Sequence, residues 1–435
     1  MTAEAGGEAG GAPQRGRGPR YAPTRFGTGL VTLMVASAYM QYTLSVLGPV
    51  LLERFTISRT QLGLLTSVLF IVGSAGSPVA GRLVDRLGAR RMIPFPFVAN
   101  TVAFLLLGLA PSYPVVLAAV AIAGAGMAFA NPLSNKLIAF HVPHGQQGLL
   151  MGIKQSGVQL AATLAGVVMP AALVLGGLAG AGVGTAVALV VGQLVVFLAV
   201  PHDPARPPGG PGALGPVTAA PDAVTAAAAT AAAELDARTR RATLLWIGLY
   251  AVLMGAGIAS VYAYLPLFAV DALGMSVGRA GLLASVIGVM GMASRIIWGA
   301  VAERLPHPSS ALVLLAGTAV VAQAMLWSAP RTGVAVLWAA VVLLGSSAVA
   351  WNTVAMFTVI RVLGAGAAGA NSGVIQLAFF SGFAIGPIVF GLLIDASGSY
   401  DLGWGAIMGA FTLATLLAGR WALLTHREGR GHSSR

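Results

Sequence analysis

The stretch GRLVDRLGARR, residues 81–91, places four arginines and one aspartate within eleven residues. Charge is rare elsewhere: only 9% of the chain is Asp, Glu, Lys or Arg, 57% is hydrophobic, and the mean hydropathy is +0.85. Soluble domains carry roughly 25% charged residues, so a soluble chain this poor in charge could not cover its surface. The composition predicts a protein of the lipid bilayer, in which a cluster of charge marks a segment outside the hydrocarbon.

Twelve apolar runs surround this stretch, and each is close to the roughly 20 residues that a spanning helix needs. They are residues 28–50, 60–80, 92–111, 114–139, 149–175, 183–200, 242–269, 279–301, 309–329, 334–360, 370–394 and 403–424. Short breaks rich in Gly, Pro and charge separate them. The pattern predicts an all-α membrane protein with twelve transmembrane helices.

A long polar segment divides the runs into two sets of six. Residues 201–241 are rich in Pro, Gly, Ala and Thr, and we interpret them as a cytoplasmic linker whose alanine-rich part, from Asp222 on, forms a separate surface helix. A tether is the simpler role for this linker, and a regulatory docking element is the alternative. The predicted organisation is therefore a tail (1–27), a first half (28–200), the linker, a second half (242–424) and a tail (425–435).

The basic residues indicate the orientation, because cytoplasmic loops carry an excess of Lys and Arg. With the N-terminus inside, all but four of the 25 Lys and Arg lie in inner segments or at inner helix ends; the exceptions are Arg54, Arg59, Arg279 and Arg331. We predict an integral multi-pass protein of the plasma or inner cell membrane, with both termini cytoplasmic. Ala36-Ser37-Ala38 resembles a signal-peptide cleavage site, but the apolar run continues to Leu52, so we expect a retained first helix.

The two halves are also repeats. SRTQLGLLTSV, residues 58–68, recurs as SVGRAGLLASV at residues 276–286, an offset of 218 residues. The same offset takes Gly81 to Gly299, Asp85 to Glu303 and Arg86 to Arg304. Parallel copies of a six-helix unit are used by transporters that bind their substrate at midplane, between the copies.

The opening stretch resembles the signature of the major facilitator superfamily, Gly-x-x-x-Asp-Arg-x-Gly-x-Arg-Arg. Every signature position matches: Gly81, Asp85, Arg86, Gly88, Arg90 and Arg91. The second copy, GAVAERLPH, keeps Gly299, Glu303 and Arg304. The resemblance covers the whole chain and implies a secondary transporter that works by alternating access. In the superfamily the signature latches the two halves on the cytoplasmic side, so we expect these nine residues to form a conformational latch; a purely positive anchor is the alternative.

Charged residues inside the spans are costly and therefore indicate function. None of the 13 carboxylates and none of the six histidines falls in the middle of a predicted span, whereas Arg295 and Lys154 do lie inside spans. A guanidinium group suits a carboxylate or nitrate because it donates in a planar fork. Several superfamily branches that carry nitrate, oxalate or monocarboxylates place an arginine in this part of the eighth helix. The alternative for both cations is that they reach to the lipid headgroups.

Uncharged polar residues gather on the helices that line the cavity in this superfamily, the first, fourth, seventh and tenth. With Gln155 of the fifth helix and the two cations, they form the predicted substrate site: Arg295, Tyr39, Gln41, Tyr42, Asn131, Lys154, Gln155, Tyr262 and Asn352. For each one singly, a hydrogen bond between helices is the alternative role.

The predicted function is transport of a small organic or inorganic anion. The alternative is an efflux pump for hydrophobic drugs or metabolites. The fifth helix (GVQLAATLAGVVMP, residues 157–170) resembles the Gly-rich, Pro-containing fifth helix of drug and proton antiporters. No acid, base, nucleophile or metal constellation lies within the spans, so an enzyme is not expected, and we predict no catalytic residue, metal or cofactor. The expected partners are the substrate and the lipid bilayer, and no nucleic acid is expected. We expect a monomer, and the sequence does not identify a coupling ion.

Overall fold

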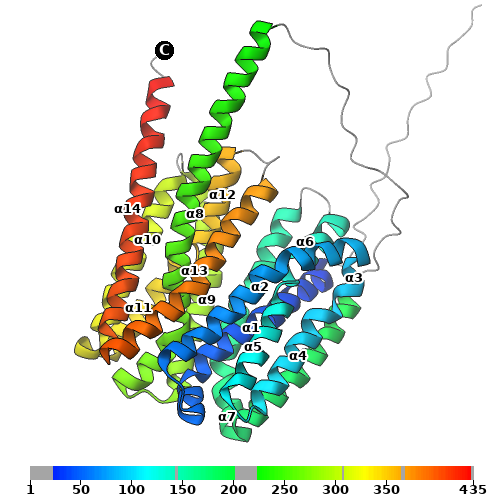
Figure 1. The fold of residues 1–435 in the computed structure, drawn as a ribbon, viewed down its shortest axis with the longest axis vertical. Coiled ribbons are helices and arrows are strands. Elements are labelled where there is room, and N and C mark those ends of the chain that lie inside the picture. Colours follow the sequence, from blue (N-terminus) through cyan, green and yellow to red (C-terminus); the bar gives the residue numbers. More distant parts are fainter. Residues whose placement is uncertain (1–22, 143–145, 201–222, 306–307, 364–367, 433–435) are drawn as a thin grey trace, which may run out of the picture.

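The computed structural model describes residues 23–142, 146–200, 223–305, 308–363 and 368–432, and these form helices without any strand (Figure 1). The helices are α1 (Pro23–Phe55), α2 (Arg59–Leu87), α3 (Ala89–Met92), α4 (Pro94–Gly108), α5 (Tyr113–Met127), α6 (Ala130–His141), α7 (Gln147–Ala199), α8 (Ala223–Leu273), α9 (Val277–Arg304), α10 (Pro308–Thr332), α11 (Val334–Ser346), α12 (Trp351–Leu363), α13 (Ala368–Ser397) and α14 (Asp401–His432).

These helices make twelve membrane spans, as predicted. By length and composition, 11 stretches of the described residues can cross a bilayer. One of them, Leu149–Ala199, has 51 residues and contains a turn at Gly176 and Gly177, so α7 supplies the fifth and sixth spans. Gly177 has a φ of +60°, a conformation that glycine adopts without strain. The fourth span is divided between α5 and α6, and the tenth between α11 and α12.

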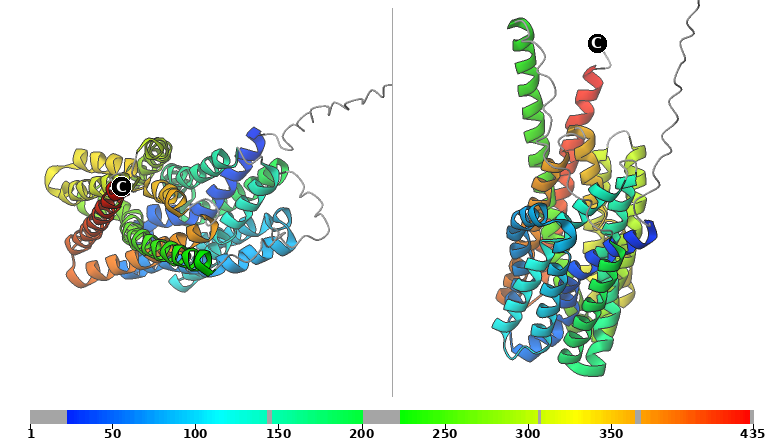
Figure 2. Two further views of the ribbon diagram at one scale, coloured as in Figure 1. Left: turned by 90° about the horizontal axis from the view of Figure 1, so that it is seen from above. Right: turned by 90° about the vertical axis from the view of Figure 1, so that its right-hand side faces the viewer.

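The two sets of six spans lie side by side, α1–α7 in one half and α8–α14 in the other (Figures 1 and 2). The first part of the predicted linker, residues 201–222, lies outside the described residues. The alanine-rich part is not a separate surface helix as predicted, because α8 begins at Ala223 and runs unbroken into the seventh span. Alanine is the best helix former, and nothing between Ala223 and the span stops the helix. The extended start of α8 rises beyond the bundle in Figure 1.

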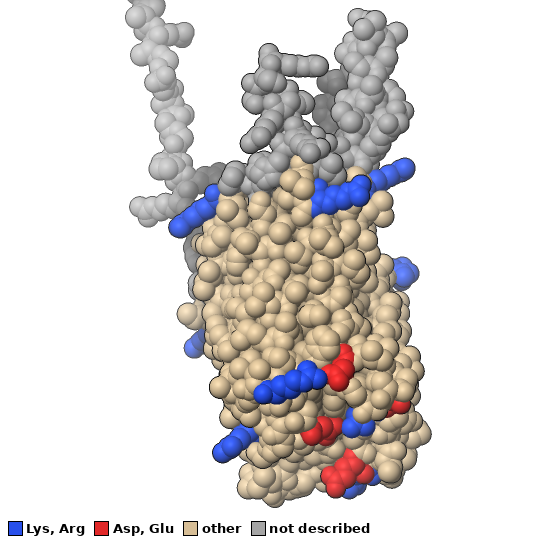
Figure 3. Space-filling view, turned by 90° about the vertical axis from the view of Figure 1, so that its left-hand side faces the viewer, with Lys and Arg blue, Asp and Glu red and all other residues tan. Residues whose placement is uncertain are grey.

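The two ends of the bundle differ in charge. We call them the Arg59 end, where α2 and α9 begin, and the Gly81 end, where both helices finish. Figure 3 shows a broad uncharged area in the centre of one face, with acidic side chains only toward the Arg59 end. Among the carboxylates whose side chains the structure describes, four lie at the Arg59 end, Glu53, Asp271, Asp395 and Asp401, and Asp85 alone lies at the Gly81 end. On this face, the uncharged area between the ends matches the hydrocarbon core of a bilayer.

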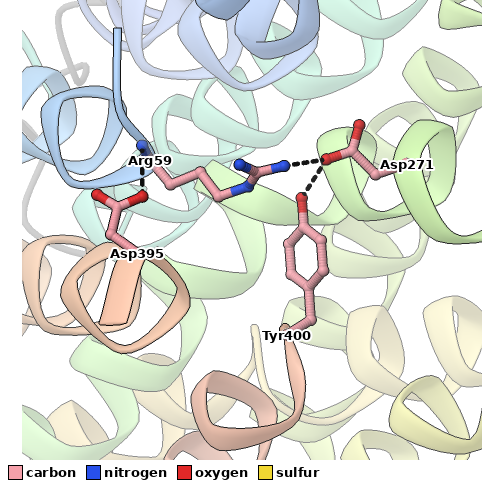
Figure 4. Close-up of polar contacts among 4 residues, drawn as sticks. All are labelled: Arg59, Asp271, Asp395 and Tyr400. Atoms are coloured by element: carbon pink, nitrogen blue, oxygen red, sulfur yellow. Dashed lines mark hydrogen bonds and ion pairs between the residues drawn. The ribbon is translucent and has the colours of Figure 1, made fainter. Parts of the chain in front are cut away.

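The halves are joined at the Arg59 end by a polar network (Figure 4). The backbone amides of Arg59 and Thr60, in the first turn of α2, donate to the Asp395 carboxylate of α13 at 3.1 and 2.8 Å. The Arg59 guanidinium lies 2.9 Å from the Asp271 carboxylate of α8, which also accepts from the Tyr400 hydroxyl at 2.7 Å. Burial and the hydrogen bond to Asp271 raise the pKa of Tyr400, so its hydroxyl keeps the proton that it donates.

Candidate substrate-binding site

A central cavity lies between the two halves, with about 920 Å³ of space between atoms including its opening. Aromatic contacts close it toward the Arg59 end: the rings of Tyr42 and Tyr262 meet edge to face with centroids 5.2 Å apart, and Phe70 lies 4.5 Å from Phe383. Just beyond, Ser45 of α1 donates its hydroxyl proton to the Tyr262 carbonyl. Among contacts between described residues, no side-chain hydrogen bond or ring contact joins the halves on the Gly81 side of the cavity.

Arg295 reaches this cavity from α9. It makes no hydrogen bond or ion pair with another described residue, and its buried Nε has no partner. No Asp or Glu is among the described residues that line the cavity. Removing a charge from water costs several kcal/mol unless an opposite charge compensates it. An unpaired guanidinium in this cavity has the charge and the donors to bind an anion.

Two amides face the same space from α7. Gln155 and Gln159 are one helical turn apart and both line the cavity, and each carries a buried Oε1 without a hydrogen-bond partner. Buried polar groups are nearly always satisfied, by protein, water or ligand. The two glutamines and Arg295 thus form a cluster of unsatisfied polar atoms from both halves.

The cavity brings together most of the predicted site residues and omits two of them. Those that line it are Gln41, Tyr42, Asn131, Gln155, Tyr262, Arg295 and Asn352.

Tyr39 lies elsewhere: its ring packs 5.8 Å from that of Phe104, and it lines a separate apolar pocket between α1, α4 and α7. Tyr39 is three residues before Tyr42, a rotation of only about 60° around α1, but its side chain contacts α4 instead of α8. We remove it from the proposed site.

Lys154 does not line the cavity either, but it lies directly behind it. Its Nζ donates to Ser134 Oγ at 2.9 Å, to Asn131 Oδ1 at 3.3 Å, and to Asn135 Oδ1. Lys154 is 3% exposed, so it does not reach the headgroups. All its contacts to described residues lie within the first half.

Sequence reasoning missed several residues of the cavity, among them the polar Ser77 and Gln376 and the aromatic Phe70, Phe379, Phe380 and Phe383. A signal for Gln376 exists, because SGVQL at residues 156–160 recurs as SGVIQL at residues 372–377, which makes Gln376 the counterpart of Gln159. The phenylalanines carry no such signal, since the same residue type also faces lipid.

Comparison with known proteins agrees with this architecture. Residues 30–387 match the model of the family described as Major Facilitator Superfamily. The chain belongs to the major facilitator superfamily. Among curated members of the superfamily, it is 24% identical over 407 residues to the "Probable sulfoacetate transporter SauU" of Cupriavidus necator, covering 89% of this chain and 92% of the relative. It is also 27% identical over 160 residues to the "Uncharacterized MFS-type transporter YfnC" of Bacillus subtilis, covering 37% of this chain and 39% of that one.

Solved structures of the superfamily share the fold. A bacterial homologue of the human lysosomal transporter Spinster, in an inward-facing and unoccupied conformation, superposes with a TM-score of 0.70 at 16% identity, covering 91% of this chain and 96% of that one. A mutant of the nucleoside transporter NupG superposes with a TM-score of 0.69 at 13% identity, covering 91% and 99%. At these identities the likeness concerns the fold alone.

The superfamily signature lies where α2 ends. Asp85 pairs with Lys136 of α6 at 3.2 Å, within the first half, and no described residue of the second half contacts its carboxylate. Arg90 donates to the Val200 carbonyl and lies over the Phe197 ring at 4.5 Å, which ties α3 to the end of α7. Arg82, Arg86 and Arg91 are exposed.

The signature glycines differ in what surrounds them. Gly88 has a φ of +91°, which explains glycine at this position. Gly81 has open space around it, whereas its counterpart Gly299 lies near Thr353 of the same half. Arg304 is exposed, and the side chain of Glu303 lies outside the described part of the structure. The role of these residues as a latch stays a prediction.

Proposed function

We propose that this superfamily member is a secondary transporter for a small organic anion, bound in the central cavity by Arg295. The observation that carries the proposal is a partly buried arginine in a cavity between the two halves. Its buried Nε has no partner, and no carboxylate is among the described residues that line the cavity. A bound carboxylate or sulfonate would satisfy both the charge and the planar fork of donors.

The relative from Cupriavidus necator supports the same class of substrate. Its name assigns sulfoacetate, a small molecule with one sulfonate and one carboxylate group, and the two chains align over nearly their whole lengths. Sulfoacetate and simple carboxylic acids are therefore the first compounds to test.

The orientation and the mechanism follow from the ends of the bundle. The excess of basic side chains at the Gly81 end supports a cytoplasmic location for that end and for both termini, in a cell membrane. The halves meet at the Arg59 end, so the cavity is sealed from the outside in this conformation. Alternating access then requires the halves to separate at the Arg59 end and to meet at the Gly81 end.

A second candidate function is export of hydrophobic compounds. The aromatic wall of the cavity favours it, because Phe70, Phe379, Phe380 and Phe383 form a continuous set of ring contacts with Trp351. Such a wall binds flat apolar molecules. An anion exporter with an apolar body would use both features of the cavity, whereas a cationic drug would meet an unpaired arginine.

Substitution of Arg295 tests the anion proposal. Arg295→Ala removes the charge, and we expect substrate affinity to fall by roughly 30- to several-thousand-fold, since a lost charged hydrogen bond costs about 2–5 kcal/mol. Arg295→Lys keeps the charge but loses the bidentate geometry, so affinity falls less but clearly. The measurement is binding of sulfoacetate and short carboxylates to purified protein in detergent, normalised to folded protein.

Arg331→Ala is the control, because it removes an exposed arginine at the Arg59 end. Wild-type affinity in Arg295→Ala would exclude Arg295 from the site. Electrogenic export of a quaternary ammonium compound from proteoliposomes would favour the drug pump instead.

A further inference from the structure

Two cations flank the central cavity from opposite halves, the partly buried Arg295 on α9 and the buried Lys154 on α7. We propose that the substrate is a dianion, with one anionic group bound by Arg295 and the other by the Asn131 amide. Lys154 orients this amide and supplies a positive charge behind it. This inference rests on the proposed function and narrows its substrate class.

The surroundings of Lys154 show a complete set of acceptors. Its ammonium group has three donors, and three side-chain oxygens receive them, from Asn131, Ser134 and Asn135. All three acceptors are neutral, and no described carboxylate contacts Lys154. Its hydrogen bonds are satisfied, but its charge is not balanced.

Lys154 also determines which way Asn131 faces. A lysine can only donate, so the amide oxygen of Asn131 must point toward it, at 3.3 Å from Nζ. The other end of the amide is then the NH₂ group, which makes no hydrogen bond to another described residue. Asn131 lines the cavity, so it presents donors there. Lys154 is thus a positioning residue that makes this wall of the cavity suitable for an anion.

The charge balance of the cavity requires two negative charges. Arg295 lines it and Lys154 lies one side chain behind it, while no Asp or Glu is among its described lining residues. In a site of low dielectric constant, a monoanion leaves one cation uncompensated, whereas a dianion neutralises both. A molecule with an anionic group at each end also contacts both halves at once. Such contact is needed if binding of the substrate is to influence how the halves move.

Matched pairs of acids and half-esters test the proposal on the full chain. Malonate, succinate and glutarate are each compared with their monomethyl esters, which keep the length but carry a single charge. We expect at least one dianion to bind roughly ten- to a hundredfold more tightly than its ester, the range of one charge-assisted hydrogen bond. Calorimetry on purified protein gives both affinities.

Two variants remove the second charge by different routes. Lys154→Met deletes the ammonium, and Asn131→Asp gives it a permanent carboxylate partner, so one variant remains if the other does not fold. In either, the ratio of dianion affinity to ester affinity should fall to about threefold or less. Lys154→Arg, which keeps the charge, should retain most of the preference.

The outcomes separate this proposal from the proposed function. Ester binding equal to dianion binding in the wild type overturns the dianion proposal and leaves anion transport intact, provided that both depend on Arg295. A dianion preference unchanged in Lys154→Met and Asn131→Asp overturns the role of Lys154. Absence of any Arg295-dependent binding of acids or esters contradicts both proposals.

Discussion

Glycines allow the helices to approach each other at two different kinds of interface. Gly166 of α7 lies against α9 of the other half, where an added Cβ would overlap the Gly281 carbonyl and the Ser285 hydroxyl. Gly386 of α13 lies against α8 of its own half, where a Cβ would overlap Ala256. Small residues at such crossings let backbones pack closely in lipid. Under the proposed alternating access, the first interface opens during transport and the second does not.

Alanine at these two positions should therefore have different effects. Gly166→Ala should weaken the contact at the Arg59 end and increase maleimide labelling of a Ser45→Cys reporter several-fold, with little change in melting temperature. Gly386→Ala should lower the melting temperature, because overpacking within a half costs roughly 1–3 kcal/mol, without increasing the labelling. The chain has no native cysteine, so the reporter is unique. Equal effects of both variants on labelling would contradict this distinction.

For single residues, the sequence predicts the chemical type of a site better than the direction in which each side chain points. Arg295 could be identified because charge inside a span is rare and costly. Tyr39 was predicted to face the cavity together with Tyr42, but it contacts α4. The spacing of two residues along one helix does not show which neighbouring helix each side chain contacts. Lys154 was predicted to contact substrate, but three local oxygens hold it behind Asn131. The contacts of a long side chain depend on neighbours that come together only in the folded bundle.

Among the helices, α2 has an unusual beginning. Ser58 and Gln61 form a capping box, which satisfies the Gln61 amide within the helix itself. The amides of Arg59 and Thr60 instead donate to Asp395 from the other half. A carboxylate at a helix N-terminus is favoured both by these bonds and by the helix dipole. The start of α2 is thus completed only when the halves meet at the Arg59 end.

Asp395→Asn should shift the protein toward the state that is open at the Arg59 end. The network is partly exposed, so the shift is modest, roughly three- to tenfold in population, as expected for a contact of about 1 kcal/mol. Labelling of Ser45→Cys should increase correspondingly, and high salt should reduce the difference between variant and wild type. Asp401→Asn is a suitable control, because Asp401 bonds Trp327 and Ser399 of its own half. Unchanged labelling in Asp395→Asn would show that this network does not stabilise closure.

Element boundaries followed from the sequence where a physical signal marks them. The break at Gly176 and Gly177 falls in the gap predicted between residues 175 and 183. The interruption between α5 and α6 was not predicted, although Pro132 gives a reason: it has no N–H to donate to the carbonyl one turn earlier. The interruption between α11 and α12 carries no proline or charge, and the sequence offers no comparable reason for it.

The whole molecule has an inter-half contact at one end and a candidate latch at the other. In this conformation Asp395 is engaged with α2, and Asp85 pairs with Lys136 inside its own half. On the latch hypothesis, Asp85 instead holds the halves together at the Gly81 end when that end closes. Two carboxylates would then favour opposite states of the transporter.

Asp85→Asn should accordingly favour the conformation described above and increase labelling of a Ser77→Cys reporter, which lines the cavity. Combination with Asp395→Asn should return the ratio of Ser77 to Ser45 labelling toward that of the wild type, because the two shifts oppose each other. Transport should slow in Asp85→Asn while expression stays nearly unchanged. If Asp85→Asn leaves both reporters unchanged, the signature acts only as a positive anchor.

One continuous helix, α2, joins these two contacts, with Pro78 as the one position inside it that cannot donate a backbone hydrogen bond. Its 29 residues run without interruption from the Asp395 contact to the signature, a length of about 43 Å. When such a helix tilts as one body, a rotation that frees its first turn carries its last turn toward the opposite half. Under the latch hypothesis both gates then cannot stand open together, and the membrane has no continuous aqueous path through the protein. The continuity of one helix would in this way protect the cell's ion gradients from leakage.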